Sequence, residues 1–196
     1  MNLLYLPVVF IVNDKWSDIE PMQQAQIELW VLEAQAGDKQ AFSALCQHFY
    51  PSAIGFAAKV AGDSTLAQDA VQDALLKLSK TIYKLEDPAT INAWVFQLVR
   101  WQVLDHLKIQ NRYKSLTEVD VHKYEAVDIK PDEAIEGLKH GLSKLPPLEG
   151  QVLHLFYLEE LSIAEIAKIL EIPKGTVKSR LFRARKLYKQ HLEQES

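Results

Sequence analysis

The sequence predicts an all-α protein with two helical domains joined by a flexible acidic linker. Apolar residues recur at helical spacing along most of the chain, and no β pattern of comparable length appears. This periodicity lapses between Asn111 and Ile129, where four acidic residues stand with little basic compensation: Glu118, Asp120, Glu125 and Asp128. We therefore expect an N-terminal extension of uncertain role at 1–21, a first domain at 22–112, the linker at 113–130 and a second domain at 131–196.

An apolar run opens the chain from Leu3 to Val12. No Lys or Arg precedes it, no small-residue cleavage site follows it, and it is too short to span a bilayer. A signal peptide is therefore not expected. The run is a strand, a docking segment or a non-native extension. We favour the last, because Met22 stands directly ahead of the first strongly periodic helix and would then lie near the true start of the domain.

The first domain opens with three predicted helices. The first covers 23–35 and ends before Gly37, because apolar residues recur on one face: Ile27, Trp30, Val31 and Ala34. Asp38 is placed to cap the second helix, Pro51 to begin the third, and Gly62 to end it.

Two longer helices complete this domain. Ser64 is the expected cap of a helix over 65–83, and after a break at 86–88 an aromatic-rich helix covers 91–108. The first of these helices has a polar stripe whose members stand at i, i+3 and i+4 and therefore share one exposed side: Asp69, Gln72 and Asp73. The stripe is either a solvated surface or a binding surface for a partner.

The second domain has a helical pattern interrupted by prolines. Pro131, followed by Asp132 and Glu133, restarts the helical pattern, and Pro146-Pro147 interrupts it. Apolar residues then continue the helix toward the C-terminal third of the chain: Val152, Leu155, Phe156 and Leu158.

The C-terminal third has the pattern of a helix-turn-helix. Ser162 and Glu165 form a capping box ahead of a short helix, and Pro173 and Gly175 open a second one. The inward positions of the second helix are expected to be Val177, Leu181, Ala184 and Tyr188. Every side chain over 174–189 that is charged at neutral pH is basic: Lys174, Lys178, Arg180, Arg183, Arg185, Lys186 and Lys189. A basic helix in this position predicts docking in the major groove of DNA, and a solvated basic face is the alternative.

Composition narrows the classes of function. Cys46 is the only cysteine, so neither a disulfide nor a cysteine metal site is expected, and a small buried thiol is the plainest interpretation. The six histidines are scattered, and no phosphate-binding loop or catalytic cluster is recognisable. We therefore expect no enzyme activity, cofactor, metal or small-molecule substrate. The net charge of −4 is unusual for a free-standing DNA-binding protein, because affinity for phosphates depends on cations.

Both domains resemble a bacterial sigma factor of the sigma-70 family, extracytoplasmic-function (ECF) group, from about Gln26 to Leu192 with only the linker unmatched. Four stretches carry the resemblance: Gly-Asp-Lys-Gln-Ala-Phe at 37–42, Gln-Asp-Ala-Val-Gln-Asp-Ala-Leu at 68–75, Ala-Trp-Val at 93–95 with Leu-Asp-His-Leu-Lys at 104–108, and Gly-Thr-Val-Lys-Ser-Arg-Leu at 175–181 with Arg-Ala-Arg at 183–185. The last stretch is the most specific. One departure occurs at 98–101, where Trp101 replaces an Asn that is frequent in the family.

The resemblance implies a transcription initiation factor that carries RNA polymerase core to promoters and opens them. Sigma region 2 would occupy 22–112 and sigma region 4 would occupy 131–196. Polymerase would bind Asp69, Gln72 and Asp73. The minus-ten element would contact Asn92, Trp94, Arg100, Trp101, Lys108 and Arg112, and the loop over 85–92 would hold a flipped base. The minus-thirty-five element would contact Lys174, Thr176, Lys178, Ser179, Arg180, Phe182, Arg183 and Arg185. A core position is the alternative for Trp94 and Phe182.

The implied partners are RNA polymerase core, promoter DNA and an anti-sigma factor, in the cytoplasm and without membrane insertion. Dependence on polymerase would also account for the negative net charge, because the holoenzyme supplies further DNA contacts. The alternative is a stand-alone helix-turn-helix regulator with an N-terminal sensing or dimerisation domain, which would bind promoters without polymerase.

Overall fold

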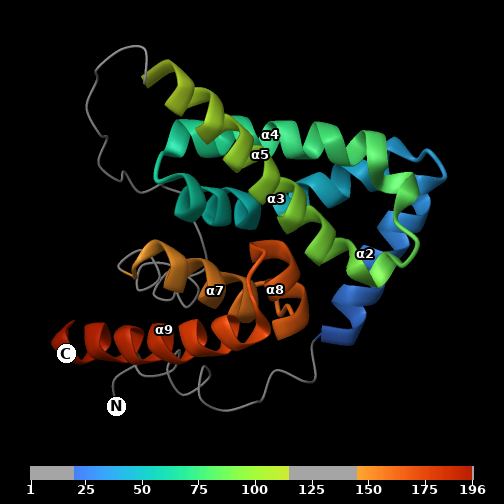
Figure 1. The fold of residues 1–196 in the computed structure, drawn as a ribbon. Coiled ribbons are helices and arrows are strands. Elements are labelled where there is room, and N and C mark those ends of the chain that lie inside the picture. The colour runs from blue at the N-terminus through green and yellow to red at the C-terminus, as the bar shows by residue number, and fades with distance from the viewer. Residues whose placement is uncertain (1–19, 115–144, 196) are drawn as a thin grey trace. The chain divides into compact units, whose positions relative to one another are not determined.

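The computed structural model describes residues 20–114 and 145–195, which contain helices and turns and no strand. The prediction of an all-α protein with two helical domains is confirmed. The chain divides into two compact units, one with most of α2 and all of α3 to α5, and one with α7 to α9 (Figure 1). The apolar N-terminal run, nearly all of the predicted linker and the predicted helix restart at Pro131 lie outside the described residues.

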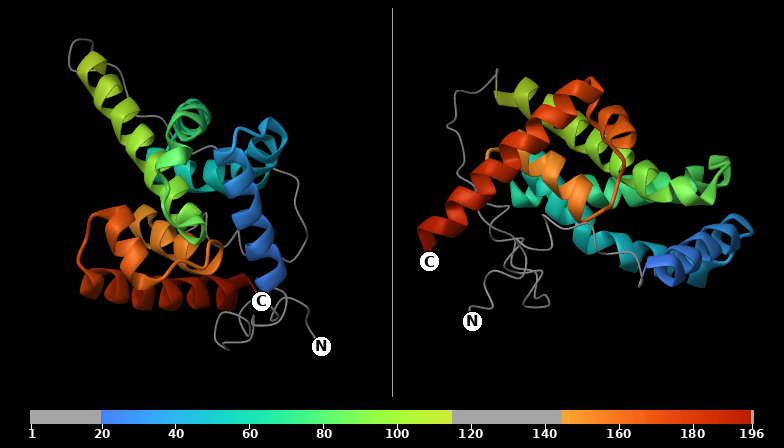
Figure 2. Two further views of the ribbon diagram at one scale, coloured as in Figure 1. Left: turned by 90° about the vertical axis from the view of Figure 1, so that its right-hand side faces the viewer. Right: turned by 90° about the horizontal axis from the view of Figure 1, so that it is seen from below.

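Three helices of the first unit pack against one another (Figure 2): α3 (Lys39–Ala61), α4 (Ser64–Thr81) and α5 (Ile91–Lys114). Their shared core contains Phe56 and Phe96, whose rings meet edge to face with centroids 5.5 Å apart. α2 (Glu20–Gln35) precedes these helices and buries Ile27 and Val31. α5 is longer than the predicted 91–108, and its end at Lys114 overlaps the first two residues of the predicted linker.

The prediction that Pro51 begins a separate helix is wrong. α3 runs without a break from Lys39 to Ala61 and contains Pro51 in its interior. A proline there cannot donate to the carbonyl oxygen four residues earlier, which normally disfavours the helix. Buried side chains on both sides of the proline, among them Phe49 and Phe56, pack into the core with α4 and α5. Packing of an apolar face stabilises helices more than local propensity does, so the helix continues.

Caps define the ends of α3 and the start of α4. As predicted, Asp38 accepts two backbone hydrogen bonds from the first turn of α3, and Gly62 ends that helix with a φ of 69°. The predicted cap of α4, Ser64, is wrong. Asp63 is the cap and accepts a hydrogen bond from the Leu66 N–H (2.9 Å). Both residue types cap helices, and the charged carboxylate also interacts favourably with the helix dipole.

The connection between α4 and α5 is held by a side chain from α2. The predicted 65–83 helix ends at Thr81, and two short 3₁₀ turns follow, η2 (Ile82–Lys84) and η3 (Pro88–Thr90). Gln35 Nε2 donates hydrogen bonds to the carbonyl oxygens of Ile82 (2.9 Å) and Leu85 (2.8 Å). The loop that leads to α5 is therefore fixed to the end of α2.

In the described residues of the second unit, one helix precedes a helix-turn-helix: α7 (Pro147–Tyr157), then α8 (Ile163–Leu170) and α9 (Lys174–Glu195). Both α7 and α8 pack against α9 (Figure 2). The four predicted inward positions of α9 are all buried. The predicted capping box is present. Ser162 Oγ accepts from the Glu165 N–H (3.2 Å), and Glu165 Oε2 accepts from the Ser162 N–H (2.8 Å).

The turn between α8 and α9 is made by Glu171. This residue adopts the left-handed conformation with a φ of 55°, and its N–H and that of Ile172 close the end of α8. Gly175, which the sequence placed at the opening of α9, lies within the first turn of that helix. Before α8, His154 Nε2 and Glu159 Oε1, both almost fully buried, lie 3.2 Å apart and fix the end of α7 to the following loop.

Cys46 lies half-buried in α3. Burial raises the pKa of its thiol, so the thiol stays protonated at neutral pH and is a weak nucleophile. Within the described ranges, no helix has the length and apolar character needed to cross a membrane.

Candidate nucleic-acid and protein interfaces

α9 exposes a polar and basic face opposite its buried residues. Of the eight predicted contacts to the minus-thirty-five element, Thr176 and Arg180 are half-buried, and the rest are exposed: Lys174, Lys178, Ser179, Phe182, Arg183 and Arg185. Phe182 is 70% exposed, so the core alternative for this side chain is wrong. Ser179 Oγ donates to the Thr176 carbonyl oxygen (3.0 Å), which leaves its lone pairs available to a donor on a base edge.

Two arginines of this face are held by α7. Arg183 Nη2 lies 3.6 Å from Glu149 Oε1, in the first turn of α7. Arg185 Nε donates to Tyr157 Oη (2.8 Å), and its guanidinium lies over the ring of Tyr157 (5.5 Å) and that of Phe156 (5.6 Å). Cation–π contact and a hydrogen bond together fix the Arg185 guanidinium at the side of α9.

Gly175 leaves the start of α9 open. A Cβ atom added to this residue would meet nothing within 4 Å, and its φ is not positive. Neither packing nor backbone conformation in the described residues therefore requires glycine at this position.

The six predicted minus-ten contacts all lie on α5. Trp94, Trp101 and Lys108 are spaced by seven residues, close to two helical turns, and therefore follow one stripe that Arg112 extends. Trp101, Lys108 and Arg112 are exposed. Asp105 interrupts the basic character of the stripe and forms an exposed ion pair with Lys108 (3.3 Å), a contact that contributes little to stability.

Three of the six predicted minus-ten contacts are less accessible. Asn92, Trp94 and Arg100 are half-buried. Asn92 Oδ1 and Trp94 Nε1 are covered and have no hydrogen-bond partner among the described residues. Because buried polar atoms are normally satisfied, these two atoms mark a place where a partner or a rearrangement would supply the missing bonds.

The polar stripe of α4 is exposed at all three predicted positions: Asp69, Gln72 and Asp73. Leu76, one turn further along, is 60% exposed and adds an apolar contact surface. His106 of α5 reaches the stripe, and its Nε2 donates to Asp73 Oδ2 (2.8 Å), because an ionised carboxylate can only accept.

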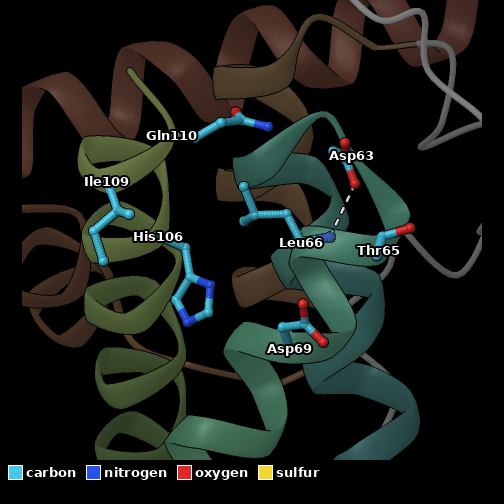
Figure 3. Close-up of a pocket in the computed structure, with 7 residues that line it drawn as sticks. All are labelled: Asp63, Thr65, Leu66, Asp69, His106, Ile109 and Gln110. Atoms are coloured by element: carbon cyan, nitrogen blue, oxygen red, sulfur yellow. Dashed lines mark hydrogen bonds between the residues drawn. The ribbon is translucent and has the colours of Figure 1, made fainter. Parts of the chain in front are cut away.

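An open pocket lies beside this stripe, between the start of α4 and the end of α5 (Figure 3). Asp69 and His106 supply polar groups to the pocket, and Ile109, 54% exposed, supplies an apolar wall. The dashed line in Figure 3 marks the Asp63 cap bond to Leu66 at its edge. In the parts of the chain that the structure describes, no group of His, Cys, Asp and Glu is arranged to hold a metal ion.

Four of these functional groups were not predicted from the sequence: Gln35, His106, Glu149 and Tyr157. Each contacts its partner across a long stretch of chain, for example 47 and 50 residues for the two bonds of Gln35 and 28 residues for Tyr157. Helical periodicity reports only neighbours within about two turns, so it contains no signal for such pairs.

Comparison with known families agrees with both units. A model described as "Sigma-70 region 2" matches residues 45–113, and one described as "Sigma-70, region 4" matches residues 135–187. The two matches occur in this order along the chain and together span more than half of it.

The chain is also similar to curated sigma factors over most of its length. It is 29% identical to the RNA polymerase sigma-H factor of Pseudomonas aeruginosa over 178 residues, which cover 84% of this chain and 92% of that protein. It is 28% identical to the ECF RNA polymerase sigma factor SigM of Mycobacterium tuberculosis, over 76% of each chain. The ECF RNA polymerase sigma factor SigW of Bacillus subtilis is 22% identical, over 86% of this chain and 98% of that protein.

Solved structures share the fold. The sigma factor RpoE of Bartonella quintana, in complex with the anti-sigma factor NepR, superposes with a TM-score of 0.62 at 24% identity over 78% of this chain and 96% of that one. CnrH, in complex with the cytosolic domain of CnrY, superposes with a TM-score of 0.57 at 20% identity over 87% and 99% of the two chains. With models of both sigma regions matched in order and ECF factors as its curated relatives, the chain belongs to the sigma-70 family of RNA polymerase sigma factors, ECF group.

Proposed function

We propose that this sigma factor reads the minus-thirty-five element with the exposed face of α9. The observation that carries the proposal is the combination, on one face of the second helix of a helix-turn-helix, of Lys178, Ser179, Phe182 and Arg183, all exposed. Arginine can donate two hydrogen bonds to a guanine edge, and a serine hydroxyl can donate to or accept from a base. An exposed Phe can contact the methyl group of thymine. The other cations predicted to contact DNA, Lys174, Arg180 and Arg185, suit phosphates.

α5 is proposed to bind the minus-ten element as unpaired DNA. Its stripe combines an exposed aromatic ring, Trp101, with the cations Lys108 and Arg112 further along, and this combination suits stacking and backbone contact with a single strand. Asn92 and Trp94 lie at the start of α5, where the loop held by Gln35 leads into the helix. A flipped base docking there would supply the hydrogen bonds that these two side chains lack.

The stripe Asp69, Gln72 and Asp73 on α4 is proposed to bind RNA polymerase core. All three side chains are exposed on a helix whose other face is fully packed against α3 and α5, so burial in the protein does not explain them. Region 2 would occupy 22–112 and region 4 would occupy 131–196. The protein would act in the cytoplasm and, like the RpoE relative crystallised with NepR, be held by an anti-sigma factor.

The test is a charge reversal at Asp69, with core binding and run-off transcription as the measurements. Asp69 is the better target than Asp73, because Asp73 also accepts the hydrogen bond from His106 and its loss would disturb the contact between α4 and α5. Asp69→Lys should abolish association with core polymerase and run-off transcription while circular dichroism and the melting temperature stay unchanged.

Glu33→Lys is the matched control, because Glu33 is exposed on α2 and the substitution makes the same change in net charge. This variant should bind core normally. Normal core binding by folded Asp69→Lys would remove α4 from the interface. Promoter-specific binding by the wild-type chain without polymerase would instead favour a stand-alone regulator.

A further inference from the structure

Glu149 is a covered acid beside an exposed arginine of the DNA-facing helix. Its side chain is 12% exposed, in the first turn of α7, whereas that of Arg183 is 60% exposed. The 3.6 Å between Arg183 Nη2 and Glu149 Oε1 is an ion-pair distance, longer than a good hydrogen bond. The acid therefore attracts one edge of the guanidinium and leaves the rest of the group accessible.

Arg183 lies on the face of α9 that is proposed to read DNA, so its contact with Glu149 can affect DNA binding. Residues of an α-helix are separated by about 100° around its axis, so Arg183 and Arg185 leave α9 on opposite sides of the buried Ala184. Arg183 lies four residues after Ser179 and next to Phe182, on the exposed face. Arg185 is fixed on the other side by Phe156 and Tyr157. α7 thus restrains an arginine on each side of the helix.

We propose that Glu149 is a specificity-determining residue, which positions the Arg183 guanidinium for a guanine edge and opposes its use on phosphate. The inference rests on the proposed function of α9. Five N–H donors in a planar fork allow Arg183 to keep Glu149 at one edge and present another edge to a base. An arginine that is already ordered loses less side-chain entropy on binding.

The Glu149 carboxylate also affects binding to DNA of any sequence. A negative charge next to the DNA-facing surface repels phosphates and competes with them for the same arginine. Glu149 therefore weakens binding to arbitrary sequences while it favours the base that Arg183 reads. A group with only a structural role would not have these opposite effects.

The experiment measures holoenzyme binding to a promoter and to templates mutated base by base in the minus-thirty-five element, with full-length wild-type, Glu149→Gln and Arg183→Ala sigma factor. Arg183→Ala should lose about tenfold or more discrimination at one base position. Glu149→Gln should lose about 2- to 10-fold at the same position, the equivalent of the ordering cost of one side chain. Its affinity for a scrambled template should rise.

Two further variants test whether Glu149 acts through Arg183 or only through its negative charge. The double variant should discriminate no worse than Arg183→Ala alone, because Glu149 acts through Arg183. Glu171→Gln removes the same charge from the exposed turn before α9, and it should leave discrimination at that position unchanged.

Wild-type discrimination by Glu149→Gln, or an equal loss at every base position together with a lower melting temperature, would overturn the role of Glu149. No position-specific loss in Arg183→Ala would instead overturn the proposed function of Arg183. The two failures are thus distinguishable.

Discussion

Gly175 is a residue whose identity the described structure does not require. It lies in the first turn of α9, its φ is not positive, and a Cβ atom would enter open space. Glycine in a helix is less favourable than alanine by about 0.5–1 kcal/mol, because it loses more conformational freedom on folding. A DNA backbone that approaches the first turn of α9 closely would account for the absence of a side chain.

Gly175→Ala should therefore raise the free energy of unfolding by roughly 0.5–1 kcal/mol and lower the affinity of holoenzyme for its promoter. Denaturant unfolding of the free protein and promoter binding by the assembled holoenzyme measure the two effects separately. A variant that is more stable and binds promoters as tightly as the wild type would show that the first turn of α9 does not approach DNA closely.

Residue-level contacts were predictable from the sequence only where the partners are close in the chain. Ser162 and Glu165 are three residues apart, and the capping box they predict is present. Arg183, predicted from the sequence as a DNA contact, is exposed, but its pairing with Glu149 could not be predicted because it depends on how α7 crosses α9. The sequence also contained no signal for the left-handed conformation of Glu171, because glycine or asparagine usually occupies such a position.

At the level of helices, periodicity predicted which segments are helical better than where they begin and end. The buried stripe of α9 and the polar stripe of α4 were both predicted, because each is a local pattern of side chains on one helix. Pro51 led to the wrong prediction of a helix start, because proline is common in the first turn of a helix. Packing of α3 against two other helices is a property of the assembled unit, and it outweighs the local cost of the proline.

Pro51→Ala should stabilise the first unit. The substitution restores a donor for the Gln47 carbonyl oxygen and removes the steric clash of the proline ring, at an exposed position in the interior of α3. Because alanine also allows the unfolded chain more freedom, the expected gain is about 1–3 kcal/mol in the free energy of unfolding. Gln47→Ala, an exposed change in the same helix, should alter it by less than about 0.5 kcal/mol. Loss of stability in Pro51→Ala would show that the core depends on a bend at the proline.

At the level of the whole molecule, charge is divided unevenly along the chain. Residues 131–196 carry equal numbers of acidic and basic residues, so the entire net charge of −4 belongs to residues 1–130. Within the second unit the basic residues are concentrated on α9, whose charged side chains over 174–189 are all cationic. The acidic part of the chain and DNA phosphates are therefore alternative electrostatic partners for the same helix.

This division predicts that the free protein binds duplex promoter DNA weakly and that a fragment from Pro131 to Ser196 binds the same duplex more tightly. The acidic part of the chain, within residues 1–130, is covalently attached to α9, so its effective concentration near that helix is high even when each contact is weak. Salt screens exposed charges over about 10 Å at 0.1 M, so the advantage of the fragment should shrink as ionic strength rises. Mobility shifts of the full-length chain and the fragment on one promoter, at a series of matched salt concentrations, measure both effects. If the full-length protein alone bound that promoter specifically and as tightly as the fragment at every salt concentration, the acidic part of the chain would not compete with DNA, and α9 would have to act without help from polymerase.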